Sequence, residues 1–259
     1  MTPRVFENIG QRLFGTCEEA GNMVVLFVES LRECRRVAEH PRRIFVQMKS
    51  IGNDTAFIAS AISFFIGMTL ALYSGNALRE FSYTDALPGL VANSIVKEMA
   101  PVITALLLAG RIGAAIAAEL GTMRVNEEID ALYTLGISPI RYLAMPRFVG
   151  CVTMLPVLVT YASFVGIFGG GIIATAHFNM TWGTYFTAAF KSLDMSDVRE
   201  GLLKATLFGA IVAVVSVHRG LSARGGAEGV GRAITSCVVT CFIWIIICDY
   251  FVARFMMSS

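Results

Sequence analysis

The stretch that decides the fold runs from residue 108 to residue 147: LAGRIGAAIAAELGTMRVNEEIDALYTLGISPIRYLAMPR. It begins as an apolar helix rich in Gly and Ala, turns polar and acidic over 126–130, and returns to an apolar run after Arg147. This pattern predicts two membrane helices joined by a short, ordered helix over about 126–136. A connection that ordered fits a helix that docks into the groove of a partner outside the membrane.

The short helix carries its own start and stop signals. Asn126 is expected to cap it, the carboxylates that follow favour the first turn, and Gly136 suits the position just past the end. The docking residues predicted on this helix are Asn126, Glu127, Glu128, Ile129, Asp130, Leu132, Tyr133 and Leu135. The alternative is a helix that lies passively on the membrane surface.

Composition places the whole chain in a membrane. The 259 residues are 55% hydrophobic and only 15% charged, with a mean hydropathy of +0.65, whereas soluble domains carry about 25% charged residues. None of the six cysteines forms a C-x-x-C pair, and most lie in apolar runs where Cys behaves as a small hydrophobe. We therefore expect one all-α integral membrane domain over 1–259, with neither disulfides nor a metal site.

Five apolar runs are long enough to cross a bilayer; they cover about 55–76, 99–121, 148–176, 201–217 and 233–256. Residues 1–53 precede this bundle (54–259) and are predicted to form basic, amphipathic helices in the headgroup layer, with a soluble helical cap as the alternative. A cytoplasmic N-terminus puts most of the 21 Lys and Arg residues inside. The C-terminus then lies on the side of the membrane away from the cytoplasm.

The run 99–121 is rich in small residues, and the next run also contains small residues at Gly166 and Gly170. Small side chains let membrane helices approach closely, so these helices are expected at the centre of a bundle or at a dimer seam. Arg111 and Glu119 lie inside the first of these runs. An Arg near the bilayer centre costs roughly 2.5 to 3.5 kcal/mol, so we expect Arg111 to face protein or water.

Three further charges stand near the outer ends of the runs. We expect Lys97, Glu98 and Asp249 to form the polar rim of an outer cavity, and purely structural pairing is an equal alternative. No G-x-x-x-x-G-K-[ST], H-E-x-x-H or G-x-S-x-G motif occurs in the chain. The chain is therefore not expected to be an enzyme, to bind nucleic acid or to hydrolyse ATP itself.

Several long motifs carry a family resemblance. KEMAPVITALLLAGRIGAAIAAELGTMRVNEEIDAL (97–132), GISP (136–139), MPR (145–147) and GGAEGVGRAIT (225–235) resemble the MlaE (YrbE) permeases of bacterial lipid transporters. In addition, DALYTLGISP (130–139) is similar to the ATPase-docking loop of other ABC importers. The similarity covers nearly the whole chain, from the amphipathic N-terminus to the apolar run 233–256.

The resemblance implies a homodimeric ABC permease in the bacterial inner membrane. Its partners would be MlaF-like ATPases that hold ATP and Mg, a periplasmic MlaD-like MCE hexamer and, bound to the ATPases, a MlaB-like STAS protein. The cargo would be phospholipid moved between the inner and outer membranes, which bears on outer-membrane lipid asymmetry. The family's lipid cavity corresponds here to Leu70, Leu78, Phe81, Lys97, Glu98 and Met99. The rivals are a secondary transporter and a structural membrane scaffold, neither with an ATPase partner.

Overall fold

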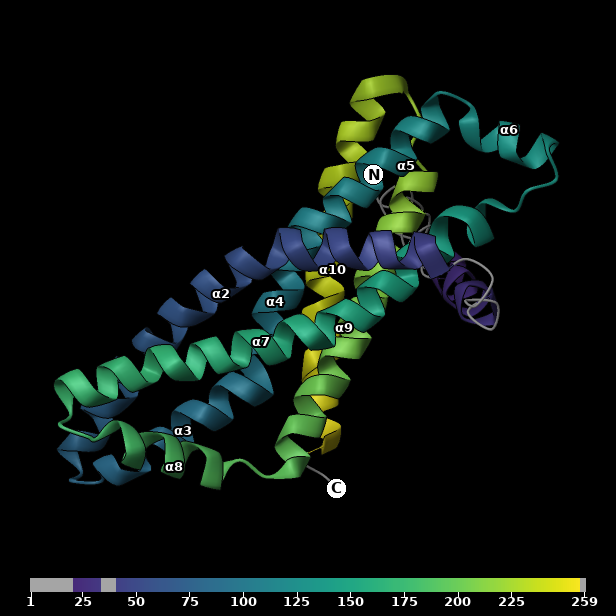
Figure 1. Cartoon of the computed structure of the whole chain (residues 1–259). Coiled ribbons are helices and arrows are strands. Elements are labelled where there is room, and N and C mark those ends of the chain that lie inside the picture. The colour runs from purple at the N-terminus through teal and green to yellow at the C-terminus, as the bar shows by residue number, and fades with distance from the viewer. Residues whose placement is uncertain (1–20, 34–40, 257–259) are drawn as a thin grey trace, which may run out of the picture.

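The computed structural model describes residues 21–33 and 41–256, which are almost entirely helical and contain no β-strand (Figure 1). The described residues 21–33 are helical. The α-helices that follow are α2 (Pro41–Glu80), α3 (Leu87–Ser94), α4 (Ala100–Leu108), α5 (Ala114–Val125), α6 (Glu128–Thr134), α7 (Met145–His177), α8 (Trp182–Ser192), α9 (Met195–Leu221) and α10 (Gly226–Met256). A 3-10 turn, η2 (Thr84–Ala86), precedes α3, and π-helical turns η3 (Ile95–Met99), η4 (Ala109–Gly113) and η5 (Ile140–Ala144) join the helices around them.

The prediction of five membrane helices is confirmed. The helical segments long and apolar enough to cross a membrane are Pro41–Glu80, Thr84–Val125, Ile140–His177, Met195–Leu221 and Gly226–Met256. Each helix begins before the apolar run that predicted it, and all but the last also end beyond it, because helical geometry continues into polar residues. The amphipathic segment expected over 1–53 lies partly outside the described residues.

Two helices, α2 and α7, run side by side along the molecule (Figure 1). Glycines bring their backbones together: a Cβ added to Gly67 would stand 1.9 Å from the carbonyl oxygen of Gly166, and one added to Gly169 would stand 2.4 Å from that of Phe64. Neither approach tolerates a side chain. The prediction that the small residues of the third span mediate close helix packing is thus confirmed.

The first membrane helix begins within the segment 1–53, for which interfacial helices are predicted. Helix α2 is one continuous helix from Pro41, about 60 Å long at 1.5 Å per residue. Its first turns pack on α7, where a Cβ on Gly52 would meet Met154 at 2.7 Å and one on Gly150 would meet Ile51 at 3.0 Å. This packing outweighs the weak helix propensity of the Gly52–Asn53 pair.

The centre of the bundle is formed by α4, α5, α7 and α9, and α10 packs on α5 and α9. Small residues again set the spacing, since a Cβ on Gly209 would meet the backbone of Cys151 at 2.7 Å and one on Gly220 would meet Leu120 at 2.7 Å. The short helix α6 projects at the end of the bundle where the α9–α10 connection also lies (Figure 1). Helix α8 and the end of α10 lie at the opposite end.

Helix α8 closes that opposite end against α7. Tyr185 is fully buried, and its hydroxyl donates a hydrogen bond to the Ile167 carbonyl at 3.2 Å. Burial raises the pKa of the Tyr185 phenol above its usual value. Trp182, Phe168 and Phe186 stack on one another, with ring centroids 5.6 to 6.5 Å apart. Membrane proteins concentrate such aromatic side chains near the ends of their spans.

Candidate functional site

Helix α6 is ordered by its C-terminal end. Gly136 has φ +72°, and its N–H donates to the Tyr133 carbonyl at 3.0 Å while that of Ile137 donates to the Leu132 carbonyl at 2.9 Å. These two bonds make a Schellman motif, so the predicted role of Gly136 is confirmed. The predicted cap at Asn126 is wrong: Asn126 closes α5, and Glu127, at φ +62°, precedes α6 without any side-chain capping bond.

One face of α6 is held and the other is open. Ile129 is buried, and Arg124 of α5 pairs with Asp130 at 2.5 Å. The side chains of Tyr133 and Leu135 are 61% and 72% exposed. A seven-residue helix that is tied to its own bundle and presents large apolar side chains outward has the form expected of a docking element. The other predicted docking residues, Glu127 and Glu128, are exposed at its start, whereas Leu132 is half-buried.

The two charges predicted inside the second span have different surroundings. Glu119, near the α6 end of α5, forms an ion pair at 2.7 Å with Arg147 of α7, whose side chain is only 4% exposed. Arg111 lies in the π-helical turn η4 on an exposed face of the helix. Glu119 therefore joins two membrane helices, which the sequence did not reveal.

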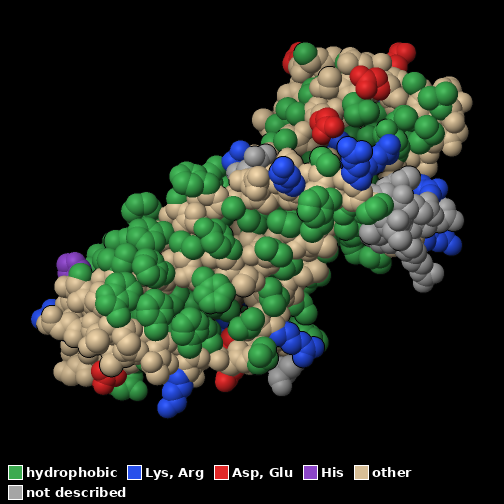
Figure 2. All heavy atoms as spheres, in the orientation of Figure 1, with side chains coloured by type: hydrophobic (Ala, Val, Ile, Leu, Met, Phe, Trp, Pro, Cys, Tyr) green, Lys and Arg blue, Asp and Glu red, His purple; other side chains and the backbone are tan. Residues whose placement is uncertain are grey.

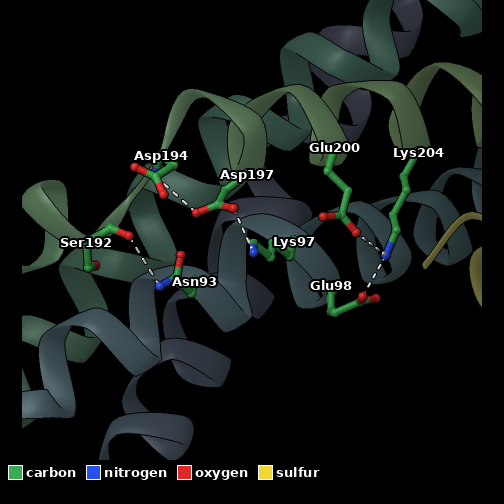
Figure 3. Close-up of polar contacts among 8 residues, drawn as sticks. All are labelled: Asn93, Lys97, Glu98, Ser192, Asp194, Asp197, Glu200 and Lys204. Carbon is green, nitrogen blue, oxygen red and sulfur yellow. Dashed lines mark hydrogen bonds and ion pairs between the residues drawn. The ribbon is translucent and has the colours of Figure 1, made fainter. Parts of the chain in front are cut away.

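A polar network lies near the opposite end of the bundle, between η3 and α9 (Figure 3). Lys97 pairs with Asp197 at 2.6 Å, and Glu98 accepts a hydrogen bond from Lys204 at 2.6 Å. Asp197 also accepts from the N–H of Asp194, which makes it part of the capping box that begins α9. The π-helical turn η3 thus directs two adjacent charges of opposite sign onto one neighbouring helix.

Lys204 is the centre of this network. Its side chain is 0% exposed, and its amino group lies 3.2 Å from Asp249 of α10 and 3.5 Å from Glu200 as well as 2.6 Å from Glu98. Three helical segments therefore meet at one buried cation. The sequence prediction brought Lys97, Glu98 and Asp249 together at one end but missed Lys204; its position on one helix face with Asp197 and Glu200, at helical spacing, was the available signal.

An apolar groove of about 510 Å³ lies along α2 and reaches Met99 of η3. Its lining residues are Ala61, Ile62, Phe65, Ile66, Thr69, Leu70, Tyr73 and Met99. Two of the predicted cavity residues, Leu70 and Met99, thus share one groove. Leu78 lies further along α2 and is half-buried, and Phe81, just past the helix, is 79% exposed.

The groove belongs to a larger apolar surface. Exposed aromatic and aliphatic side chains follow α2 and α10, and Figure 2 shows hydrophobic side chains covering the flank of the molecule. On α10 they include Ile246, Tyr250 and Phe251, which are 59%, 65% and 64% exposed. Surfaces of this extent are covered by lipid or by another protein chain.

Comparison with known proteins agrees with this architecture. The chain matches the family model described as permease MlaE over residues 44–255. It is 34% identical over 254 residues to a probable ABC transporter permease protein of Rickettsia bellii, with 98% of each chain covered. It is also 38% identical over 221 residues to a probable ABC transporter permease protein of Synechocystis, covering 84% of this chain and 83% of that one. With the chloroplast protein TRIGALACTOSYLDIACYLGLYCEROL 1 of Arabidopsis thaliana it shares 32% identity over 216 residues, covering 83% and 62%.

Proposed function

Since this chain belongs to the MlaE permease family, we propose that it is the subunit through which an ABC transporter moves phospholipid between the inner and outer membranes of a bacterium. Permeases of this family are transport subunits, and ATP hydrolysis belongs to a separate ATPase. ATP and Mg would accordingly be bound by the partner. The observation that carries the proposal is the pairing of an outward-facing helix at one end, α6, with an apolar groove on the membrane-spanning surface.

The ATPase docks on α6. Tyr133 and Leu135 supply the apolar contact, and Glu127 and Glu128 supply charge at the rim. The ion pair between Arg124 and Asp130 anchors the helix to α5, so a partner that moves α6 also moves a membrane helix.

The groove along α2 receives acyl chains. Its lining is apolar apart from Thr69 and the Tyr73 hydroxyl, which suits hydrocarbon, and Glu98 lies beside Met99 where a headgroup would meet polar residues. A second copy of the chain, packed through the exposed faces of α2 and α10, would close the groove into a cavity. The name of the Arabidopsis relative refers to a glycerolipid, which supports a lipid cargo.

The orientation follows from charge. Arg124, Arg141 and Arg147 lie at the α6 end, so the positive-inside rule puts α6 in the cytoplasm with the ATPases and a MlaB-like STAS protein. The opposite end, with α8 and the end of α10, then faces the periplasm. An MCE-domain hexamer of the MlaD type would receive lipid there.

Co-purification tests the docking. The chain is co-expressed with the ATPase encoded beside it, and the complex is isolated through a tag on the permease. Tyr133→Ala combined with Leu135→Ala should remove the ATPase from the complex. Tyr83→Ala, which truncates a tyrosine of similar exposure (64%) at the opposite end, should leave the ATPase bound.

Two results would count against the proposal. An unmodified permease that elutes without any ATPase favours a secondary transporter or a structural scaffold. A complex that survives the double substitution places the ATPase elsewhere. Lipid transfer is measured separately, with fluorescent phospholipid in vesicles that contain the complex, and transfer that does not depend on ATP would exclude an ABC mechanism.

A further inference from the structure

A second pocket lies at the α6 end, between the first turns of α2 and the segment that runs from η5 into α7. Its volume is about 400 Å³, and its lining includes Arg42, Arg43, Gln47, Tyr142 and Arg147. No acidic side chain is among the described residues that line it. It is therefore a basic pocket. Its lining residue Gln47 lies 23 residues before Leu70 of the apolar groove on the same helix, which is about 35 Å at 1.5 Å per residue.

The floor of this pocket is a buried cation. Arg147 is 3% exposed; its Nη1 donates to the Leu143 carbonyl at 2.8 Å, and its Nη2 pairs with Glu119 at 2.7 Å. Its Nε has no hydrogen-bond partner among the described residues. A buried N–H without an acceptor costs free energy. The Arg147 Nε–H is therefore a donor that a ligand in the pocket could satisfy.

The mouth of the pocket holds two more arginines. The Arg43 guanidinium lies 4.0 Å from the centroid of the Tyr142 ring, and this cation–π contact restrains the side chain at the rim without neutralising it. The nearby carboxylates already have partners, since Glu33 pairs with Arg141 at 3.9 Å and Glu119 with Arg147. Arg42 and Arg43 form no ion pair with any described residue, so their charges remain available to a ligand.

We infer that this pocket binds the headgroup of an anionic phospholipid from the membrane leaflet at the α6 end. Guanidinium groups match phosphate oxygens in charge and geometry, and the Gln47 amide supplies further polar contacts for a glycerol headgroup. Val46 and Pro146 form apolar walls, and the charge-free part of α2 begins at Thr55, two to three turns further on. A headgroup held here has its acyl chains directed along an apolar helix.

Charge and position together favour a lipid over a soluble anion. Basic side chains gather in a band between the apolar flank and the acidic tip of the molecule, at the level where a membrane surface would lie (Figure 2). Basic pockets between membrane helices bind anionic headgroups. The site is distinct from the apolar groove, and the inference holds whether or not phospholipid is the cargo.

Native mass spectrometry of the full chain in detergent tests the inference, with dioleoyl phosphatidylglycerol and dioleoyl phosphatidylcholine as probes. The wild-type chain should bind phosphatidylglycerol more tightly than phosphatidylcholine. Arg42→Gln combined with Arg43→Gln should lower the affinity for phosphatidylglycerol about 25-fold, because each arginine near a membrane surface contributes roughly fivefold. Binding of phosphatidylcholine should change little.

The matched control is Arg79→Gln, the same substitution in the last turn of the same helix, about 54 Å away at 1.5 Å per residue. It should keep the preference for phosphatidylglycerol. Equal affinity for the two lipids in the wild-type chain, or an unchanged preference in the double variant, would overturn the inference. Competition with inorganic phosphate distinguishes a lipid headgroup from a free phosphate ion as the ligand. If millimolar phosphate displaces the lipid completely, the pocket is a site for free phosphate rather than for a lipid headgroup.

Discussion

Lys204→Met tests how much of the bundle depends on the buried network. The substitution keeps the length and apolar stem of the side chain and removes only the cation. Glu98, Glu200 and Asp249 then face one another without a counter-charge, where Lys204 now lies within 2.6 to 3.5 Å of each. The expected result is a large loss of stability, because three carboxylates remain in a partly buried space.

The exposed fractions set the size of that loss. Removing one partner of a buried ion pair costs about 3–5 kcal/mol. The side chain of Glu98 is 40% exposed and that of Asp249 23% exposed, so water relieves part of the repulsion and the lower value, about 3 kcal/mol, applies. Lys97 is itself 37% exposed in its pair with Asp197, so Lys97→Met should cost only about 1 kcal/mol.

Thermal unfolding in detergent measures the difference. Cys151, Cys237 and Cys241 are buried free thiols, whereas Cys248 is half-buried. A thiol-reactive dye therefore reports unfolding once the other three cysteines, Cys17, Cys34 and Cys248, have been replaced by Ser. At about 2–4 °C per kcal/mol, Lys204→Met should lower the melting temperature by roughly 6–12 °C and Lys97→Met by about 2–4 °C.

A double variant tests whether the unpaired carboxylates cause the loss of stability. Glu98→Gln added to Lys204→Met removes one of the unpaired carboxylates and should restore part of the lost stability. If the two substitutions are additive, or if Lys204→Met lowers the melting temperature no more than Lys97→Met, the network does not stabilise the bundle. The residues Lys97, Glu98 and Asp249 would then be better explained by a role in transport alone.

Four further substitutions test other contacts. Gly67→Ala should cost about 1–3 kcal/mol, since its Cβ meets the α7 backbone at 1.9 Å; Gly110→Ala, with open space around the new Cβ, should leave the melting temperature unchanged or slightly raised. Gly136→Ala forces an L-residue into φ +72°, at about 1–2 kcal/mol, and should speed hydrogen exchange at the end of α6; unchanged exchange would contradict the Schellman assignment. Arg147→Met should lower the melting temperature less than Lys204→Met, because the carboxylate that it leaves behind is 59% exposed and becomes hydrated.

Much of the fold was predictable because it follows from local rules. Charge-free runs marked the membrane helices, and Gly136 marked the end of α6 because few other residues adopt positive φ. The start of α6 was not predictable in the same way. Helix α5 continues through Val125, where Arg124 reaches Asp130, so Asn126 closes one helix instead of opening the next.

The partners within the polar network could not be predicted from the sequence. The sequence placed Lys97, Glu98 and Asp249 at one end of the bundle, because each stands near the end of an apolar run. The pairing partner could not be chosen without knowing which face of α9 turns toward η3. Lys204 reads in the sequence as a charge near a helix end that snorkels to water, yet packing buries it completely.

Two ion pairs determine how a movement of α6 would reach the membrane helices. Arg111 and Glu119 both lie in the run 99–121, so the sequence alone offers a connection along one membrane helix only. In the structure, Glu119 instead pairs across to Arg147 of α7, and Asp130 of α6 pairs back to Arg124 of α5. We therefore expect a displacement of α6 to move α5 and α7 together at their shared end. Helix α7 packs along α2 through glycines whose backbones are in close contact. A shift of α7 at that end would therefore also displace α2, which lines the apolar groove.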